Sequence, residues 1–354
     1  MEHIYSRFVL DGNPVSCERY GNGHINHTYL LLTDKPHAYI LQGLNTHVFK
    51  DIPGLMNNLI AVTDHLRKQD NDPRHVLTLV PTVDGKPYLA TEDGEYWRLY
   101  EFVTDSLCLD KPESLNDLHQ SGVAFGRFQN QLADFPAETL TETIPRFHDT
   151  PNRYEHLKQA VHENRAGRLL EVQYELGFYM MHEHEAATLM DMCRRGELPL
   201  RVTHNDTKLN NVMLDKDLRT PLCVIDLDTV MPGLAANDFG DSIRFGASTA
   251  AEDEKDLSKV TMSLELFEAY ARGFLGECGK RLTQNEIETL AMGAKLMTLE
   301  CGVRFLTDYL NGDVYFHISR PEHNLDRART QMKLVQDMEA KWDRMQQSVR
   351  MAAQ

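Results

Sequence analysis

The sequence predicts an α+β fold with two lobes, a small antiparallel β-sheet in residues 1–104 and a mostly helical lobe in residues 105–354. Three observations lead to this prediction. Short apolar runs separated by turn-forming residues, the pattern of strands and hairpins, continue as far as Val103. From Leu115 onward, apolar residues recur at helical spacing over long segments. The length of 354 residues is sufficient for two lobes with cores of their own.

The N-terminal lobe begins with three predicted strands, Val15–Tyr20, Thr28–Leu32 and Ala38–Gln42. The segment Asp51–Gln69 follows, and its apolar residues recur at helical spacing, with Pro53 in a position that suits a first helical turn. The remaining apolar runs, two of them divided by an Asp-Gly turn, predict further strands: Val76–Val83, Pro87–Ala90 and Glu95–Val103.

The C-terminal lobe is predicted from long segments with a helical apolar pattern. One of them contains His182, Glu183, His184 and Glu185, residue types that also serve as metal ligands. Alternating residues do not share a helix face, so we interpret these four as a solvated polar face. The predicted helices are Leu115–Phe135, Arg153–Leu170, Gln173–Arg195, Ser258–Leu275, Thr283–Leu310 and the second part of Ser319–Trp342.

Composition narrows the function classes. The formal net charge is −16, and an acidic surface disfavours nucleic acids and anionic membranes, because both need cationic patches. No segment approaches ~20 consecutive apolar residues, and the first ten residues lack a long apolar core, so we predict neither a membrane span nor a signal peptide. The six cysteines are scattered without a CxxC pair, which favours buried free thiols. We therefore expect a cytoplasmic, monomeric protein with small-molecule partners.

The strongest functional signal surrounds a predicted hairpin, whose strands are Val212–Leu214 and Leu222–Ile225. A polar loop before the hairpin contains Asp206 and Asn211, and Asp226 follows directly after it. The hairpin would hold these three side chains on one rim. An Asp, an Asn five residues later and a second Asp beyond a short hairpin are typical of a phosphoryl-transfer site.

Each of these side chains has an expected role. Asp206 is the candidate general base, which orients the acceptor hydroxyl and accepts its proton. Asn211 and Asp226 are the candidate ligands of Mg²⁺, which prefers hard oxygen donors. Asn210 competes with Asn211 for this role. Asp228 would share a face with Asp226 if the strand continued, so it could contact the acceptor or a second metal ion.

Two further residues near this motif have expected structural roles. His204 is expected to hold the backbone of the loop and not to titrate during catalysis. Asp238 begins an Asp-Phe-Gly sequence like that of protein kinases. However, the metal-binding aspartate should close the strand after the loop, and Asp226 already does so. We therefore interpret Asp238 as a structural residue at the start of the next helix.

The motif from His204-Asn205-Asp206 to Asn211, followed by Ile225-Asp226, resembles the aminoglycoside phosphotransferase and choline kinase superfamily, whose members resemble protein kinases in fold. Longer phrases are similar to those of N-acetylhexosamine 1-kinases and extend from about residue 20 to residue 335: VTHNDTKLNN, IDLDTVMPG, DFGDSIRFGAST, TETIPRFHDTP and PEHNL. The resemblance implies ATP as phosphoryl donor and Mg²⁺ as cofactor. It also implies phosphorylation of the anomeric C1 hydroxyl of N-acetylglucosamine and N-acetylgalactosamine.

The resemblance also indicates a nucleotide site in residues 1–104. The candidate cofactor-binding residues are Gly21 and Gly23 in a turn between two strands, Gln42, and Glu101 and Val103 where the last strand passes into a linker. Kinase-like folds usually carry a phosphate-binding lysine at the position of Gln42, and this chain has none there. Either Mg²⁺ and loop amides hold the nucleotide, or this alignment of the strand is wrong.

The candidate acceptor-binding residues are His24, Asp228, Phe245, Arg304 and Tyr315. Such a pocket would recognise the hydroxyl groups of the acceptor, because a ligand without them would leave polar groups of the pocket unpaired. Three of these residues have structural alternatives. Arg304 could instead form an ion pair with Glu300, and Tyr315 and Phe245 could be core residues.

Two other functions are compatible with the sequence. The first is a kinase of the same superfamily with another small acceptor, such as choline, homoserine or an aminoglycoside. The second is a nucleotide-binding pseudokinase without catalysis, which only the missing strand lysine supports. The presence of Asp206, Asn211 and Asp226 argues against it.

Overall fold

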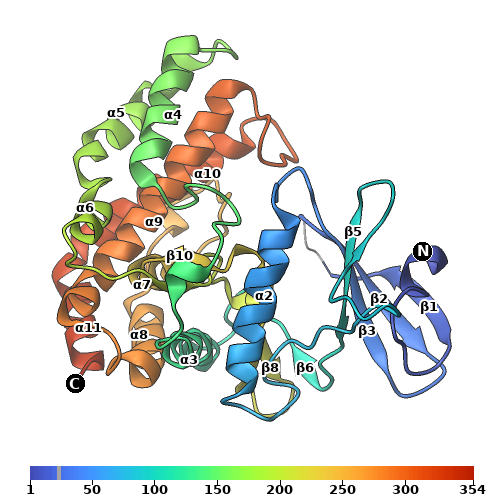
Figure 1. Ribbon diagram of the computed structural model, residues 1–354. Coiled ribbons are helices and arrows are strands. Elements are labelled where there is room, and N and C mark those ends of the chain that lie inside the picture. Colours follow the sequence, from blue (N-terminus) through green and yellow to red (C-terminus); the bar gives the residue numbers. More distant parts are fainter. Residues whose placement is uncertain (22–24) are drawn as a thin grey trace. The chain divides into compact units, whose positions relative to one another are not determined.

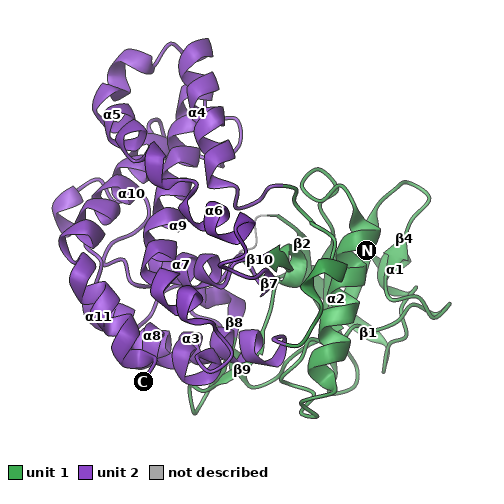
Figure 2. Cartoon of the chain, turned by 60° about the vertical axis from the view of Figure 1, so that its left-hand side comes forward, with its two compact units in different colours: residues 1–107, 134–145, 213–232 green, residues 108–133, 146–212, 233–354 purple. Residues whose placement is uncertain are grey.

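The computed structural model describes residues 1–21 and 25–354, and its chain folds into two compact units. Unit 1 contains Met1–Leu107, Asp134–Pro145 and Met213–Pro232, and unit 2 contains Cys108–Ala133, Arg146–Val212 and Gly233–Gln354 (Figure 2). The first break lies close to the expected boundary near Thr104. The assignment of functional lobes to residues 1–104 and 105–354 stays a prediction.

Unit 1 is built on a five-stranded antiparallel sheet with the strand order β1-β2-β3-β5-β4. Its strands are β1 (Pro14–Arg19), β2 (His27–Thr33), β3 (Ala38–Gly43), β4 (Leu89–Ala90) and β5 (Tyr96–Glu101) (Figure 1). A smaller sheet consists of β6 (Ser106–Leu107), β8 (Val212–Asp215) and β9 (Pro221–Val224). The expected strands of the motif hairpin are therefore present as β8 and β9.

The two faces of the larger sheet differ, because successive side chains of a strand point to opposite sides. On one face, Leu41 of β3 and Leu99 of β5 are buried in a cluster with Ile4 of the short helix α1 (Glu2–Tyr5). On the other face, Gln42 of β3 lies opposite Arg98 of β5. The polar pair therefore belongs to the face that does not pack on α1.

The remaining helix of unit 1, α2 (Ile52–Arg67), begins as the sequence predicts. The side chain of Asp51 accepts a hydrogen bond from the backbone N–H of Gly54 at 2.9 Å, and Pro53 lies in the first turn. Asn58 on the buried face of α2 donates to the backbone carbonyls of Thr141 and Val230. These contacts tie the two later segments of unit 1 to α2.

Unit 2 is mostly helical, and its centre is the long helix α9 (Gln284–Asn311), which packs against α4, α7, α10 and α11. Helices α7 and α9 approach closely, since a Cβ atom on Gly293 would lie 1.9 Å from the backbone oxygen of Ala236. The other elements of unit 2 are α3 (Leu115–Gln131), α4 (Thr150–Glu163), α5 (Gln173–Met181), α6 (Thr188–Arg194), α7 (Ala235–Gly246), α8 (Leu264–Cys278), α10 (His323–Ala340), α11 (Trp342–Ala352) and the short strand β7 (Arg201–Thr203).

The predicted α+β class, with an antiparallel sheet followed by a mostly helical part, is confirmed. Several details are wrong. The expected strand Val76–Val83 forms only isolated bridges, and α11 was not expected. Among the described residues, no helix is both long enough and apolar enough to cross a membrane.

The expected helix Gln173–Arg195 is broken into α5, a 3₁₀ turn at Glu183–Glu185, and α6. The break places His182 against Glu339, and Lys295 between Glu185 and Glu339. His182 is only 6% exposed. The interpretation of these residues as a solvated polar face is therefore wrong for His182, because the end of α5 turns it inward.

Candidate active site

The candidate catalytic loop of unit 2 runs from His204 to Asn211, between β7 and β8. Within it, Asp206 receives two polar contacts from the same loop. The side-chain amide of Asn211 donates to Asp206 Oδ2 at 3.0 Å, and Lys208 Nζ lies 2.8 Å from Asp206 Oδ1. The Asp206 side chain is 27% exposed, so its carboxylate is held in place and still accessible.

Buried Asp238, in the first turn of α7, anchors the backbone of this loop. Its carboxylate accepts hydrogen bonds from the backbone N–H groups of His204 and Asn205, each at 2.8 Å, and from the side-chain amide of Gln129 at 3.0 Å. Burial raises the pKa of Asp238, although the hydrogen bonds that its carboxylate accepts oppose that effect. The expected structural role of Asp238 is confirmed.

A second carboxylate of α7, Asp241, continues the anchoring. It accepts the backbone N–H of Thr207 at 3.0 Å and contacts the guanidinium of Arg244 at 3.1 Å. The hydroxyl of Ser242 donates to the backbone carbonyl of Thr207 at 2.7 Å. One face of α7 therefore holds the loop backbone at His204, Asn205 and Thr207 and leaves the side chain of Asp206 for other contacts.

His204 is fully buried and packs its ring edge-on against Phe125 and Phe128 of α3. Its Nδ1 atom accepts the backbone N–H of Asp206 at 3.3 Å. A ring nitrogen that accepts this bond carries no proton. The expectation that His204 holds the backbone of the loop is confirmed.

The charge of Asp206 is set by two opposing effects. Burial would raise the pKa of its carboxyl group, but the nearby ammonium group of Lys208 and the hydrogen bond from Asn211 outweigh burial and lower it. The pKa of Lys208 is raised to about 12, because its attraction to Asp206 and Asp241 exceeds the opposing cost of burial. Asp206 is therefore ionised at neutral pH, as a general base must be.

Asn211 is suited to hold a metal ion by its remaining polar atom. Its amide nitrogen donates to the backbone oxygen and to the carboxylate of Asp206, at 2.8 and 3.0 Å. Within the described residues, its amide oxygen has no hydrogen-bond partner. A hard oxygen donor that its own amide group holds in orientation fits Mg²⁺.

In unit 1, the chain leaves β9 at Val224, and Asp226 adopts a left-handed backbone conformation with φ of 59°. The carboxylate of Asp226 is exposed, which suits a metal ligand. A 3₁₀ turn over Leu227–Thr229 follows, and Asp228 is only 2% exposed. The strand does not continue through Asp226, so the expectation that Asp226 and Asp228 share a strand face is wrong.

Both carboxylate oxygens of Asp228 have partners within unit 1. Arg98 Nη1 lies 2.5 Å from Oδ1, and the side-chain amide of Asn26 donates to Oδ2 at 2.6 Å. Arg98 also donates from Nε and Nη2 to the amide oxygen of Gln42, at 3.0 and 2.8 Å. A buried guanidinium therefore links β3, β5 and the segment after β9.

Arg98 was missed from the sequence. Its only signal was an arginine inside the apolar run EYWRLYEFV, where a buried cation needs a partner. Gln42 lies on β3 as predicted, and its amide oxygen binds Arg98. A nucleotide contact by Gln42 stays a prediction.

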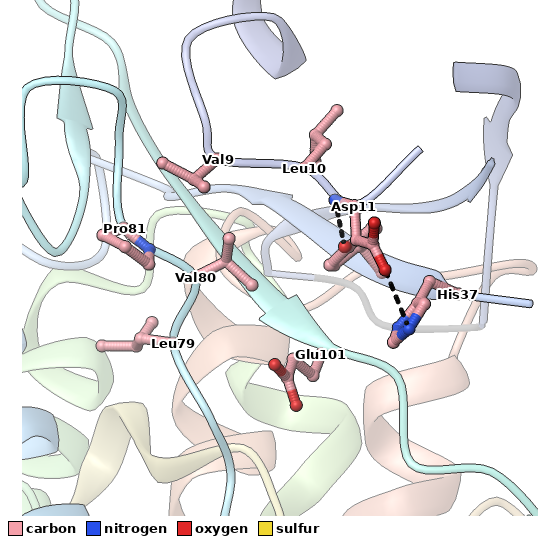
Figure 3. A pocket seen from close by; sticks show the side chains of 9 residues that line it. Val9, Leu10, Asp11, His37, Leu79, Val80, Pro81 and Glu101 are labelled. Atoms are coloured by element: carbon pink, nitrogen blue, oxygen red, sulfur yellow. Dashed lines mark hydrogen bonds and ion pairs between the residues drawn. The ribbon is translucent and has the colours of Figure 1, made fainter. Parts of the chain in front are cut away.

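The other candidate nucleotide-binding residues do not form a group with Gln42 among the described residues. Gly21 has a φ of 74°, which suits the turn after β1, and Gly23 lies outside the described residues. Val103 is buried, and its carbonyl accepts the hydroxyl of Ser106 at 2.7 Å. Glu101 lines a pocket of about 340 Å³ whose lining includes Tyr39, on the sheet face opposite Gln42 and Arg98 (Figure 3).

Of the candidate acceptor residues, Arg304 and Tyr315 come together in unit 2. The guanidinium carbon of Arg304 lies 5.8 Å from the centroid of the Tyr315 ring, and 5.4 and 5.9 Å from those of Phe316 and Phe147. The Tyr315 side chain is 70% exposed, so it is not a core residue. Phe245, at the end of α7, is half-buried beside Arg244, and His24 lies outside the described residues.

The loop that carries Tyr315 is held by Asp308, which sequence reasoning missed. The carboxylate of this buried residue accepts the backbone N–H groups of Val314, Tyr315 and Phe316, each at 2.9 Å. The side-chain amide of Asn324 donates to the same carboxylate at 2.9 Å. The position of Tyr315 is thus set by α9 and α10.

Glu300 does not pair with Arg304 through a direct salt bridge, as the structural alternative required. Its carboxylate instead contacts His148 Nδ1 at 3.0 Å and accepts the hydroxyl of Thr150 at 2.7 Å. His148 in turn contacts the backbone oxygen of Asn205 at 3.2 Å. Within unit 2, these contacts connect the turn of α9 next to Arg304 with the residue before Asp206.

Comparisons with known proteins agree with this architecture. A family model described as a phosphotransferase enzyme family matches residues 16–272. An aminoglycoside phosphotransferase from Alicyclobacillus acidocaldarius is similar with a TM-score of 0.65 and 13% identity, over 99% of this chain and 96% of that chain. An amicoumacin kinase in complex with AMP-PNP and Ca²⁺ gives 0.62 and 12%, over 95% and 92%. A microcompartment-associated aminopropanol kinase gives 0.59 and 15%, over 96% of each chain.

Proposed function

The chain belongs to the phosphotransferase enzyme family, and on that premise we propose that it transfers the γ-phosphoryl group of ATP to the anomeric C1 hydroxyl of N-acetylhexosamines. The acceptors are N-acetylglucosamine and N-acetylgalactosamine, and the products are the sugar 1-phosphate and ADP. The observation that carries this proposal is the group formed by Arg304, Tyr315 and Phe316, in the same unit as Asp206. It combines the exposed aromatic ring of Tyr315 with the hydrogen-bond donors of the Arg304 guanidinium.

The protein contributes positioning and proton transfer to this reaction. The C1 oxygen of the sugar forms a bond to the γ-phosphorus, and the bond from that phosphorus to the β–γ bridging oxygen breaks. The C1 hydroxyl proton passes to the carboxylate of Asp206. Lys208 and Asn211 orient this carboxylate, and α7 holds the loop backbone beneath it.

Asn211 and Asp226 are the residues that would hold Mg²⁺. Both offer a hard oxygen, and the amide nitrogen of Asn211 is already engaged by Asp206. When bound, the ion would offset negative charge on the nucleotide phosphates. The buried guanidinium of Arg98 neutralises Asp228, which follows Asp226 by two residues.

The charge around Arg304 favours an uncharged acceptor over a cationic one. Arg153 of α4 lies close enough that burial and repulsion by Arg304 lower its pKa. A quaternary ammonium or a polyamine would add positive charge beside these two guanidinium groups. A neutral sugar would instead accept hydrogen bonds from them and stack on the exposed ring of Tyr315.

An acceptor panel tests this proposal through ADP release measured with ATP and Mg²⁺. The free N-acetylhexosamines are compared with their 1-O-methyl glycosides, which keep every group except the anomeric hydroxyl. Choline, homoserine and an aminoglycoside complete the panel. We expect turnover with the free sugars and none with the methyl glycosides. Equal turnover of the methyl glycosides would refute transfer to C1, and turnover of the amines alone would refute the sugar acceptor.

A further inference from the structure

The side chain of His148 lies between two acceptors in the interior of unit 2. It precedes α4, whose first turn is capped by the Asp149 side chain accepting the backbone N–H of Asn152 at 3.0 Å. The Nδ1 atom of His148 lies 3.0 Å from Glu300 Oε1 of α9, and its Nε2 atom lies 3.2 Å from the backbone oxygen of Asn205. The ring is therefore fixed at both nitrogens and is only 10% exposed.

These contacts define the protonation of the ring. A backbone carbonyl can only accept a hydrogen bond, and so can an ionised carboxylate. Both ring nitrogens of His148 must then carry a proton, and the ring is an imidazolium. Burial opposes that charge, but Glu300 outweighs burial and raises the pKa of His148. For the carboxyl group of Glu300, burial alone would raise the pKa, but His148 and nearby arginines lower it. Both groups therefore stay charged.

His148 and His204 hold the two ends of one peptide group. The carbonyl of Asn205 accepts from His148 Nε2, and the N–H of Asp206, across the same peptide bond, donates to His204 Nδ1 at 3.3 Å. Asn205 has a φ of 64°, a left-handed conformation that asparagine tolerates better than most residues with a side chain. The orientation of this peptide group sets where the side chain of Asp206 begins.

We infer that His148 is a cationic positioning residue that fixes the peptide group before Asp206, so that turnover is lost when His148 releases its proton. Loss of one N–H leaves either Asn205 or Glu300 without its donor, and the peptide group can then rotate. The charged groups that face His148 come from three helices. Glu300 of α9 and, at longer range, Asp241 of α7 act on His148 itself, whereas Arg304 of α9 and Arg153 of α4 act on its partner Glu300.

This inference rests on the proposed role of Asp206 as base, and a comparison of pH profiles tests it. In the wild-type enzyme, kcat should fall as pH rises through the raised pKa of His148. The variant H148Q keeps a neutral donor for Asn205 but cannot titrate. Its kcat should be about 10- to 100-fold lower, as for a small misplacement of a reacting group, and should lack this alkaline loss, with KM for ATP unchanged. E300Q should move the alkaline loss to lower pH, since it removes the carboxylate that favours the imidazolium.

The control variant is H182Q, at the residue that follows α5. His182 is also buried, with its nitrogens 2.8 Å from the carbonyl of Phe178 and 3.0 Å from Glu339 Oε1, but neither partner belongs to the catalytic loop. Replacement should lower thermal stability in both variants and change the pH profile only for H148Q. The same alkaline loss in H148Q as in the wild type, or its disappearance in H182Q as well, would overturn the inference.

A second measurement does not depend on the acceptor or on the folding of a variant. Nitrogen NMR of the wild-type protein without substrates reports whether each ring nitrogen of His148 is protonated. We expect both nitrogens protonated at pH 6, and a titration that also shifts the backbone amide of Asp206. A neutral ring at pH 6, or a titration that leaves this amide unchanged, would contradict the inferred role of His148. A failed sugar assay alone would instead contradict the proposed function and leave this result intact.

Discussion

Two aspartates of the motif region, Asp206 and Asp228, each pair with a cation, but in opposite surroundings. The pair of Asp206 and Lys208 is partly exposed, at 27% and 34%. The pair of Asp228 and Arg98 is buried, at 3% and 1%. An accessible carboxylate can exchange its partner for a substrate group, whereas a buried one is committed to the fold. This difference in burial is why the two aspartates, only 22 residues apart, have different expected roles.

Surroundings also determine what each pair contributes to stability. Exposed ion pairs typically contribute about 0–1 kcal/mol, because water screens the charges. Breaking a buried pair by removing one partner typically costs about 3–5 kcal/mol, because the other charge stays buried and uncompensated. Variants of the two pairs should therefore separate catalysis from stability.

The largest effect is expected for Asp206→Asn. The variant keeps the shape and the contact with Asn211 but cannot accept a proton, so kcat should fall by about 10²- to 10⁴-fold. The melting temperature and nucleotide affinity should be close to wild type. They are measured by scanning calorimetry and by titration with a non-hydrolysable ATP analogue. A variant that retains most of its turnover would exclude Asp206 as the base.

The second effect is expected for Arg98→Met, which leaves Asp228 buried without its cation. The free energy of unfolding in urea should fall by about 3–5 kcal/mol. The double variant Arg98→Met/Asp228→Leu removes both charges and should recover much of that loss. Equal unfolding free energies for the single variant and the wild type would show that the buried pair is not what connects β5 with the segment after β9.

The smallest effect on stability is expected for Lys208→Met, at about 0–1 kcal/mol, because the pair is partly exposed. The same variant should change the pH dependence of kcat. Lys208 is the main group that lowers the pKa of Asp206, and without it burial raises that pKa. Since the ionised carboxylate is the active form, the loss of activity on the acid side should move to higher pH. An unchanged acid limb would show that Lys208 does not set the charge of Asp206.

The parts of the site that the sequence could predict are local ones. Asp206 and Asn211 are five residues apart, and the contact between them depends only on the loop that contains both. The strands β3, β8 and β9 were likewise predicted from short apolar runs, and all three are present.

The residues that were missed depend on contacts between distant segments. Arg98 and Asp228 are 130 residues apart, and the nearest signal of their pairing was a charged residue in an apolar run. His148 and Glu300 are separated by 152 residues, and Glu300 instead suggested a local pair with Arg304 on one helix. Tertiary packing determines which of these residues pair, and the spacing of residues along the chain does not reveal that packing. The broken helix before β7 was missed for the same reason, since the contact of His182 with Glu339 exists only in the folded chain.

The most direct test of the proposed function is the structure of the reaction product. Wild-type protein, ATP, Mg²⁺ and N-acetylglucosamine are incubated together, and the product is examined by phosphorus and proton NMR without purification. We expect a phosphate whose phosphorus couples to the anomeric proton of the sugar. A phosphorus coupled to the C6 protons, or ATP consumption without any sugar phosphate, would contradict it.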